Sequence, residues 1–150
     1  MAPDLHRPVV LALHYQNEVL HAQGGFRFGA AADAVARERV VGTASALLAL
    51  ARAQGWPIVH VRIAYRPDHS DVIQNCTIFR TVVAQRAMVD GSWGAQFLDA
   101  LQPRISALEH VITHNRVNAF FRTPLADMLE SLAPSALLVG GVATNSVVEH

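Results

Sequence analysis

The first half of the chain runs strand, long helix, strand, and this order constrains the fold more than any other feature. Residues 8–13 are apolar throughout, which is typical of a parallel strand buried on both faces. Residues 30–53 carry Ala, Leu and Val at helical spacing, Gly55 predicts the end of that helix, and residues 57–63 predict a second strand. Two parallel strands need a crossover of this length, and such crossovers are right-handed almost without exception. The pattern therefore predicts a parallel sheet with helices packed on it.

The second half continues the alternation of helices and strands. Hydrophobic spacing predicts short helices at 78–88 and 93–101, a strand at 110–113, a helix at 125–132 and a strand at 136–139. Thr123 followed by Pro124 predicts an N-cap with proline at the first helical position. The run at 136–139 is unbroken and apolar, which again indicates a strand covered on both faces. The predicted fold class is α/β, with three layers, α/β/α, around a mostly parallel, doubly wound sheet.

Length and composition predict a single domain over residues 1–150. The chain is 51% hydrophobic, which suffices for a substantial core. Twelve Lys and Arg balance twelve Asp and Glu, so the chain offers no basic surface for nucleic acid or an acidic membrane. No apolar run approaches the roughly 20 residues that cross a bilayer, and no apolar signal segment precedes the first strand. Cys76 is the only cysteine, so no internal disulfide forms, and we expect a cytoplasmic protein whose partner is a small molecule.

The last sixteen residues predict the floor of an active site. Gly140 and Gly141 follow the fourth strand and allow a sharp turn, and Thr144 can cap a helix that starts near Ser146. A strand, a tight turn and a helix N-terminus present free backbone N–H groups, which hold anions and developing oxyanions. We expect the backbone of Ala143, Thr144 and Val147 to form this oxyanion cradle.

Two histidines follow the first and third predicted strands. His14 and His114 each come one residue after an apolar strand, so both imidazoles are expected at the same edge of the sheet. Imidazole titrates near neutrality and can act as a general acid or base. The alternative is that both rings only hydrogen-bond loop backbone. A metal held by this pair would need a third ligand, and no His-x-x-x-His or Glu-x-x-His spacing supplies one, so we predict no metal and no cofactor.

Four segments together resemble the isochorismatase-like hydrolases. Residues 11–18 are similar to a strand that ends in Asp-x-Gln-Asn in that family, and residues 59–67 resemble its second strand and the loop after it. Residues 111–125 resemble the pattern Lys-x-x-x-Ser-Ala-Phe-x-x-Thr-x-Leu, and residues 141–149 resemble Gly-Val-Ala-Thr-Asn-x-Cys-Val-Glu. The segments occur in the family's order. The family's last helix, strand and helix have no counterpart here, so we expect the sequence to be truncated after His150.

The resemblance implies a site at the carboxyl ends of the strands, where an Asp, a Lys and a Cys carry amide hydrolysis. This chain departs from the pattern at all three positions, with His14 in place of Asp, His114 in place of Lys and Val147 in place of Cys. The resemblance also implies a cis peptide bond at Val142–Ala143 and a homo-oligomer. Valine offers no lone pair, so covalent catalysis by that residue is excluded.

Further side chains beside these positions are candidates for the site. Ser146 is one residue before the lost Cys and is a weaker candidate for a nucleophile than for a helix cap. The predicted substrate-binding side chains are Gln16, Asn17, Arg66 and Phe120. Each also has a structural interpretation. The two amides can hydrogen-bond the loop backbone, the arginine can be a solvated surface cation, and the phenylalanine can pack in the core.

Two functions remain open at this point. In the first, the chain is a hydrolase of a small amide, carbamoyl compound or vinyl ether and works without a covalent intermediate. His14 acts as acid and base, and His114 polarises or orients the substrate. In the second, the chain is a catalytically inactive member that binds a small metabolite or serves as an assembly partner. Loss of all three family residues favours the second, and two titratable rings at one edge favour the first.

Overall fold

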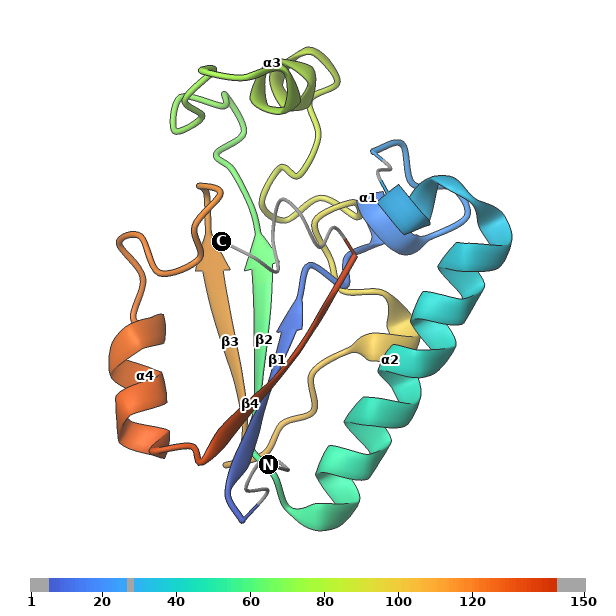
Figure 1. The fold of residues 1–150 in the computed structure, drawn as a ribbon. Coiled ribbons are helices and arrows are strands. Elements are labelled where there is room, and N and C mark those ends of the chain that lie inside the picture. The colour runs from blue at the N-terminus through green and yellow to red at the C-terminus, as the bar shows by residue number, and fades with distance from the viewer. Residues whose placement is uncertain (1–5, 27–28, 143–150) are drawn as a thin grey trace.

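The computed structural model describes residues 6–26 and 29–142, and these form four parallel strands flanked by helices (Figure 1). The strands are β1 (Pro8–Leu13), β2 (Ile58–Ile63), β3 (Glu109–His114) and β4 (Ala136–Gly141), in the sheet order β3-β2-β1-β4. The α-helices are α1 (Asn17–Leu20), α2 (Ala34–Gln54), α3 (Thr77–Ala84) and α4 (Leu125–Leu132), with short 3-10 turns η1 (Gly29–Ala32) and η2 (Asp99–Leu101). This architecture confirms the predicted α/β fold class.

Two clusters of buried side chains hold the layers together, one on each face of the sheet. Val10 and Ala12 of β1 pack with Leu48 of α2, whereas Val9 and Leu11 pack with Leu125 of α4. Successive side chains of a strand point to opposite faces. β1 is therefore apolar at every position because it lies between two helical layers, as its sequence predicts.

The long helix confirms its predicted end and begins later than predicted. The Asp33 side chain accepts a hydrogen bond from Ala36 N at 2.8 Å, which caps α2 at its N-terminus. Gly55 ends the helix with φ 70°, the left-handed conformation that glycine adopts at low cost. Residues 29–32 form η1 instead of the first turn of α2.

The predicted helix at 93–101 is wrong except for its last turn, η2. The backbone of this segment pairs with the loop after β1: Asn17 N donates to Gln96 O and Leu98 N donates to Tyr15 O, each at 2.9 Å. These tertiary hydrogen bonds satisfy backbone groups that a helix would satisfy internally. The helix predicted at 78–88 ends at Ala84, since Arg86 and Met88 have positive φ.

Two further boundaries differ from the sequence-based expectation. Pro124 is the residue before α4 and not its first residue; Thr123 Oγ1 accepts from Leu125 N at 3.4 Å. β4 continues through Gly141, so no turn occurs at Gly140. Within the described residues β4 pairs with β1 alone, which leaves Leu137 and Val139 42% and 41% exposed and makes the predicted two-sided burial of this strand wrong.

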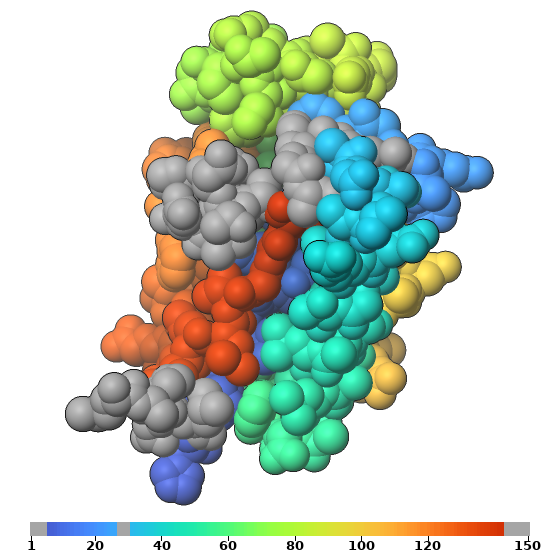
Figure 2. All heavy atoms as spheres, turned by 45° about the vertical axis from the view of Figure 1, so that its right-hand side comes forward, coloured from blue at the N-terminus to red at the C-terminus, as the bar shows by residue number. Residues whose placement is uncertain are grey.

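The segment with α3 stands beyond the carboxyl ends of the strands, and α2 lies beside β4 on the face shown in Figure 2. The carboxyl edge of the sheet is thus the edge that α3 approaches. No helix within residues 6–26 and 29–142 is long and apolar enough to cross a membrane.

Candidate active site

His14 and His114 meet at the carboxyl edge of the sheet. Their Nε2 atoms are 2.5 Å apart, and their rings are stacked with centroids 4.8 Å apart. Two neutral imidazoles in contact through nitrogen require one N–H donor and one lone-pair acceptor. The structure therefore brings together the two side chains that the sequence places after β1 and at the end of β3.

The backbone around His14 is held in an uncommon conformation. His14 has φ 59°, a left-handed value that a non-glycine residue adopts at some cost. His14 N donates to Val61 O at 2.8 Å, and Gln16 N donates to His14 O at 2.8 Å. These bonds hold the turn in which the chain leaves β1 and direct the imidazole toward β3.

Gln16 fixes this turn through three hydrogen bonds of a fully buried side chain. Its Nε2 donates to Ile63 O and to Ala95 O at 2.8 Å, and its Oε1 accepts from Ile63 N at 2.9 Å. Asn17 Nδ2 donates in the same way to Trp93 O at 3.0 Å. These are the contacts of loop-fixing residues, so substrate binding by either amide stays a prediction.

Both site imidazoles are neutral at physiological pH because they are buried. Burial and, to a smaller extent, the neighbouring His114 lower the pKa of His14 from 6.5 to about 3. Burial also lowers the pKa of His114 to about 4, although the Arg116 backbone opposes part of this change. The pair titrates as a unit, so both values describe the dyad.

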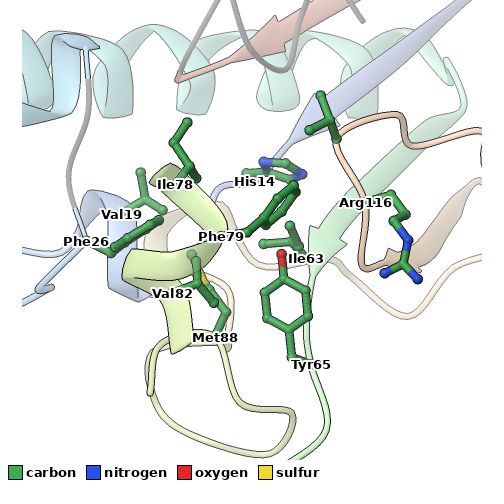
Figure 3. Close-up of a pocket in the computed structure, with 11 residues that line it drawn as sticks. His14, Val19, Phe26, Ile63, Tyr65, Ile78, Phe79, Val82, Met88 and Arg116 are labelled. Carbon is green, nitrogen blue, oxygen red and sulfur yellow. The ribbon is translucent and has the colours of Figure 1, made fainter. Parts of the chain in front are cut away.

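Two hollows border the dyad, one on each side. His14 lines a cavity of about 80 Å³ whose walls include Phe79 and Tyr65 (Figure 3). His114 lines a more polar hollow of about 320 Å³ together with Asp71 and Asn115. Arg116 borders both. Within the described residues, the two imidazoles therefore line different hollows and do not share a single pocket.

Within the described residues, no group of three His, Cys, Asp or Glu side chains is arranged to hold a metal ion. The dyad supplies two nitrogens and the loop beside it supplies Asp71, whose carboxylate accepts from Arg66 N at 3.0 Å and from Asn115 Nδ2 at 3.2 Å. That carboxylate therefore already has two donors.

The remaining predicted site residues either do not line the two hollows beside the dyad or lie outside the described residues. Arg66 is exposed and bonds Asp71 through its backbone, and Phe120 is 44% exposed. Ala143, Thr144, Ser146 and Val147 lie outside the described residues, as does the Val142–Ala143 peptide bond.

Tyr65 and the apolar face of α3 also border the dyad, although no sequence motif marks them as site residues. Ile78, Phe79 and Val82 of α3 line the cavity beside His14, and the Tyr65 ring rises between them and Arg116 (Figure 3). The spacing of 78, 79 and 82 is a helical apolar stripe, so it indicates that α3 packs on something. The spacing does not identify the surface against which α3 packs.

Comparisons with known proteins agree with this architecture. The sequence profile of the isochorismatase domain matches residues 8–150. Maleamate amidohydrolase from Pseudomonas putida is 32% identical over 105 residues, which cover 70% of this chain and 47% of that protein. Ureidoacrylate amidohydrolase from Methylorubrum extorquens is 27% identical over an alignment of 162 positions, which covers 99% of this chain and 64% of that protein. The chain thus spans less than two thirds of the length of these curated relatives.

Solved structures show the same fold. A cysteine hydrolase from Pseudomonas syringae superposes with a TM-score of 0.74 at 20% identity, covering 99% of this chain and 66% of the other. An isochorismatase-like hydrolase from Alkaliphilus metalliredigens gives a TM-score of 0.73 at 21% identity, covering 95% of this chain and 70% of the other. These structures share the fold, and the profile match over residues 8–150 shows that the chain belongs to the isochorismatase family of hydrolases.

Proposed function

We propose that this protein hydrolyses a small amide or carbamoyl compound without a covalent intermediate, with His14 and His114 as its acid-base pair. The contact between the two Nε2 atoms carries the proposal, because it sets two titratable rings at the sheet edge where ligands of open α/β folds bind. Both curated relatives described above are amidohydrolases by name, which supports an amide as substrate.

The dyad can move one proton through a hydrolytic cycle. Two neutral imidazoles carry two protons on four nitrogens, and one proton lies in the contact between them, so one further lone pair is left to accept a proton. As the oxygen of a water molecule bonds to the amide carbon, the pair takes the proton from that water. The pair then returns the proton to the leaving nitrogen as the C–N bond breaks, which yields a carboxylic acid and ammonia.

The depressed pKa values favour the second of these steps. An imidazolium in this site surrenders its proton readily, so it is a strong general acid toward the leaving nitrogen. The same low pKa makes the neutral pair a weak base, so the attack of water requires additional stabilisation of the oxyanion that forms on the carbonyl oxygen. In the proposal, backbone N–H groups of residues 143–147 meet that demand.

Replacing either histidine tests the proposal directly. With maleamate and ureidoacrylate as probes, His14→Ala and His114→Ala should each lower kcat/KM by about 100-fold or more, which is the usual size of a lost general acid or base. His110→Ala is the matched control, because it lies on the same strand four residues before the dyad. Unchanged rates in both dyad variants, with folding confirmed by circular dichroism, would end the proposal.

The pH profile is a second test of the same site. Since the dyad is neutral above about pH 4, kcat/KM should stay flat from pH 8 to pH 5 and fall only below that. A histidine with an ordinary pKa near 6.5 would instead give a fall that starts near neutrality. A midpoint near 6.5 would show that the dyad does not carry the reaction.

One observation favours the second candidate function, an inactive member that binds a metabolite. The two imidazoles border different hollows, and the one that His14 lines holds only about 80 Å³. Ligand binding in the absence of any turnover, unaffected by His114→Ala, would select this alternative.

A further inference from the structure

Arg116 is the one described residue that lines both hollows beside the dyad. It borders the apolar cavity together with His14 and the polar hollow together with His114. Its guanidinium is turned away from the apolar wall formed by α3 (Figure 3). A ligand that fills the polar hollow therefore meets an imidazole of the dyad and this cation together.

The Arg116 side chain is held through only one of its three nitrogens. Nη1 donates to Asp71 O at 2.6 Å, to Asn115 O at 2.9 Å and to Asn115 Oδ1 at 3.3 Å. In the described part of the chain, Nε is buried without a hydrogen-bond partner and Nη2 makes no hydrogen bond. A buried N–H without an acceptor is costly and uncommon, so the Nε–Nη2 edge of this guanidinium is short of an acceptor.

The positive charge of Arg116 also lacks a partner. In the part of the chain that the structure describes, no carboxylate forms an ion pair with this residue. Asp71 offers it a backbone carbonyl, whereas the Asp71 carboxylate accepts from Arg66 N and Asn115 Nδ2. The guanidinium is thus fixed in place by neutral carbonyl groups and keeps its full charge.

The polar hollow suits a small anion in size and in charge. Its volume of about 320 Å³ lies at the lower end of the range for small-molecule sites. Arg116 and Arg122 line it together with Asp71, so the hollow has a net positive charge while His114 is neutral. Arg122 is exposed, so water screens its charge more than that of the partly buried Arg116.

Another arginine of the same protein shows what the free edge of Arg116 can bind. Arg52 Nε is 2.6 Å from Glu109 Oε1 and Arg52 Nη2 is 3.4 Å from Glu109 Oε2, so this edge holds both oxygens of one carboxylate. The planar fork favours carboxylates because two charge-assisted hydrogen bonds form together. Arg116 has the same two donors free. Since its Nε is buried, a carboxylate that binds Nη2 gains the second bond by a small rotation of the guanidinium.

We propose that the polar hollow binds the carboxylate of an amide substrate through the Nε–Nη2 edge of Arg116, with the amide group beside His114. The inference rests on the proposed function for the role of the dyad. It adds a substrate class, small amides that also carry a carboxylate, and a specificity-determining residue. Maleamate and ureidoacrylate, the probes named above, both belong to this class.

The ligands 4-oxopentanoate and hexane-2,5-dione test the proposal, because they have the same number of non-hydrogen atoms, differ in charge and contain no amide bond to hydrolyse. The wild-type protein should bind 4-oxopentanoate at least about tenfold more tightly than the dione, since a hydrogen bond to a charged group is the stronger kind. The Arg116 Nε–H resonance, followed by NMR, should move when 4-oxopentanoate binds and stay in place with the dione.

Variants of Arg116 separate recognition from a structural role. Arg116→Gln should weaken 4-oxopentanoate binding about tenfold or more and change dione binding by less than about twofold. Arg116→Lys keeps the charge without the fork and should recover only part of the affinity. Arg80→Gln is the matched control and should bind as the wild type does, because Arg80 is an exposed arginine of α3 that lines neither hollow. In hydrolysis of maleamate, Arg116→Gln should raise KM more than it lowers kcat.

Four results would overturn the proposal: no 4-oxopentanoate binding to the wild type, equal affinity for the dione, an unmoved Arg116 Nε–H resonance, or equal changes for both ligands in Arg116→Gln. The last would mean that Arg116 only holds its loop through Nη1. If Arg116→Gln does not fold, the wild-type resonance and Arg116→Lys decide. These results separate from the proposed function. If carboxylate binding follows Arg116 while both dyad variants keep full turnover, the recognition stands and the acid-base role fails; the converse pattern removes the recognition alone.

Discussion

The sheet contains a second buried histidine site, and its contrast with the dyad shows what burial alone does. His60 lies in the middle of β2 with no exposed surface, and its Nε2 is 3.6 Å from Glu109 Oε2. Burial lowers the pKa of His60 to about 4, close to the value of His114. A carboxylate at this distance would ordinarily hold an imidazole in its charged form. Here it does not.

The reason is that burial of the His60 ring outweighs the attraction of Glu109, a carboxylate that also has other partners. Arg52 Nε donates to Glu109 Oε1 at 2.6 Å, and the backbone N–H of Arg104 donates to Oε2. Burial by itself would raise the pKa of Glu109, but these donors outweigh it and hold that pKa below the ordinary value. The Arg52 charge also repels a proton on His60. A low pKa in a buried histidine therefore does not identify a functional site. The dyad differs from His60 in two ways. It borders a cavity, and each of its imidazoles contacts a second titratable ring.

The largest expected effect comes from breaking the Arg52–Glu109 pair. Arg52→Ala leaves a carboxylate that is only 3% exposed without its guanidinium, and we expect unfolding to become easier by about 3 kcal/mol. The pKa of His60 should rise from about 4 toward its usual value in this variant, because the repulsion is removed and Glu109 needs a new partner. Chemical denaturation measures the first effect, and an NMR titration of His60 measures the second.

Arg62→Ala is the matched control for that experiment. Arg62 Nη2 is also 2.6 Å from its partner Asp90, but that carboxylate is 59% exposed. A solvent-exposed pair contributes at most about 1 kcal/mol. Equal losses in the two variants would show that burial of Glu109 has no part in the stability of this corner of the sheet.

The sequence predicts the main strands and helices well, because their positions depend on the local spacing of apolar residues. The bounds of β1 and α4 agree with the apolar spacing, and the meeting of His14 and His114 follows from two parallel strands ending at the same edge. The cavity could not be predicted, because α3 and Tyr65 converge on it through a loop with no periodic signal. The helix predicted at 93–101 fails for a related reason, since its backbone pairs with a distant loop.

A separate effect, which depends on pH, is a loss of stability in mild acid. His14, His60 and His114 have folded pKa values of about 3, 4 and 4, all below the unfolded value of 6.5. Between about pH 6.5 and pH 4 the unfolded chain therefore binds more protons than the folded chain, so stability falls as the pH falls. Each group contributes at most about 1.4 kcal/mol per pH unit. Denaturant unfolding at pH 7, 6 and 5 should show this trend, and a stability that stays constant to pH 5 would mean that the three rings are not desolvated.

The smallest effect separates the two histidine sites. His60→Leu replaces a neutral ring that makes no hydrogen bond within the described residues, so stability at pH 7 should change by less than about 1.5 kcal/mol. The same substitution removes one of the three protonation sites, so the fall in stability between pH 6.5 and pH 5 should become shallower by about one part in three. Any turnover found in the test of the dyad variants should be unaffected, because His60 has no exposed surface and packs against the Phe97 ring. A His60→Leu protein that folds, keeps the full acid dependence and loses turnover would reverse the assignment: the buried ring beside Glu109 would then belong to the chemistry, and the dyad would be the structural pair.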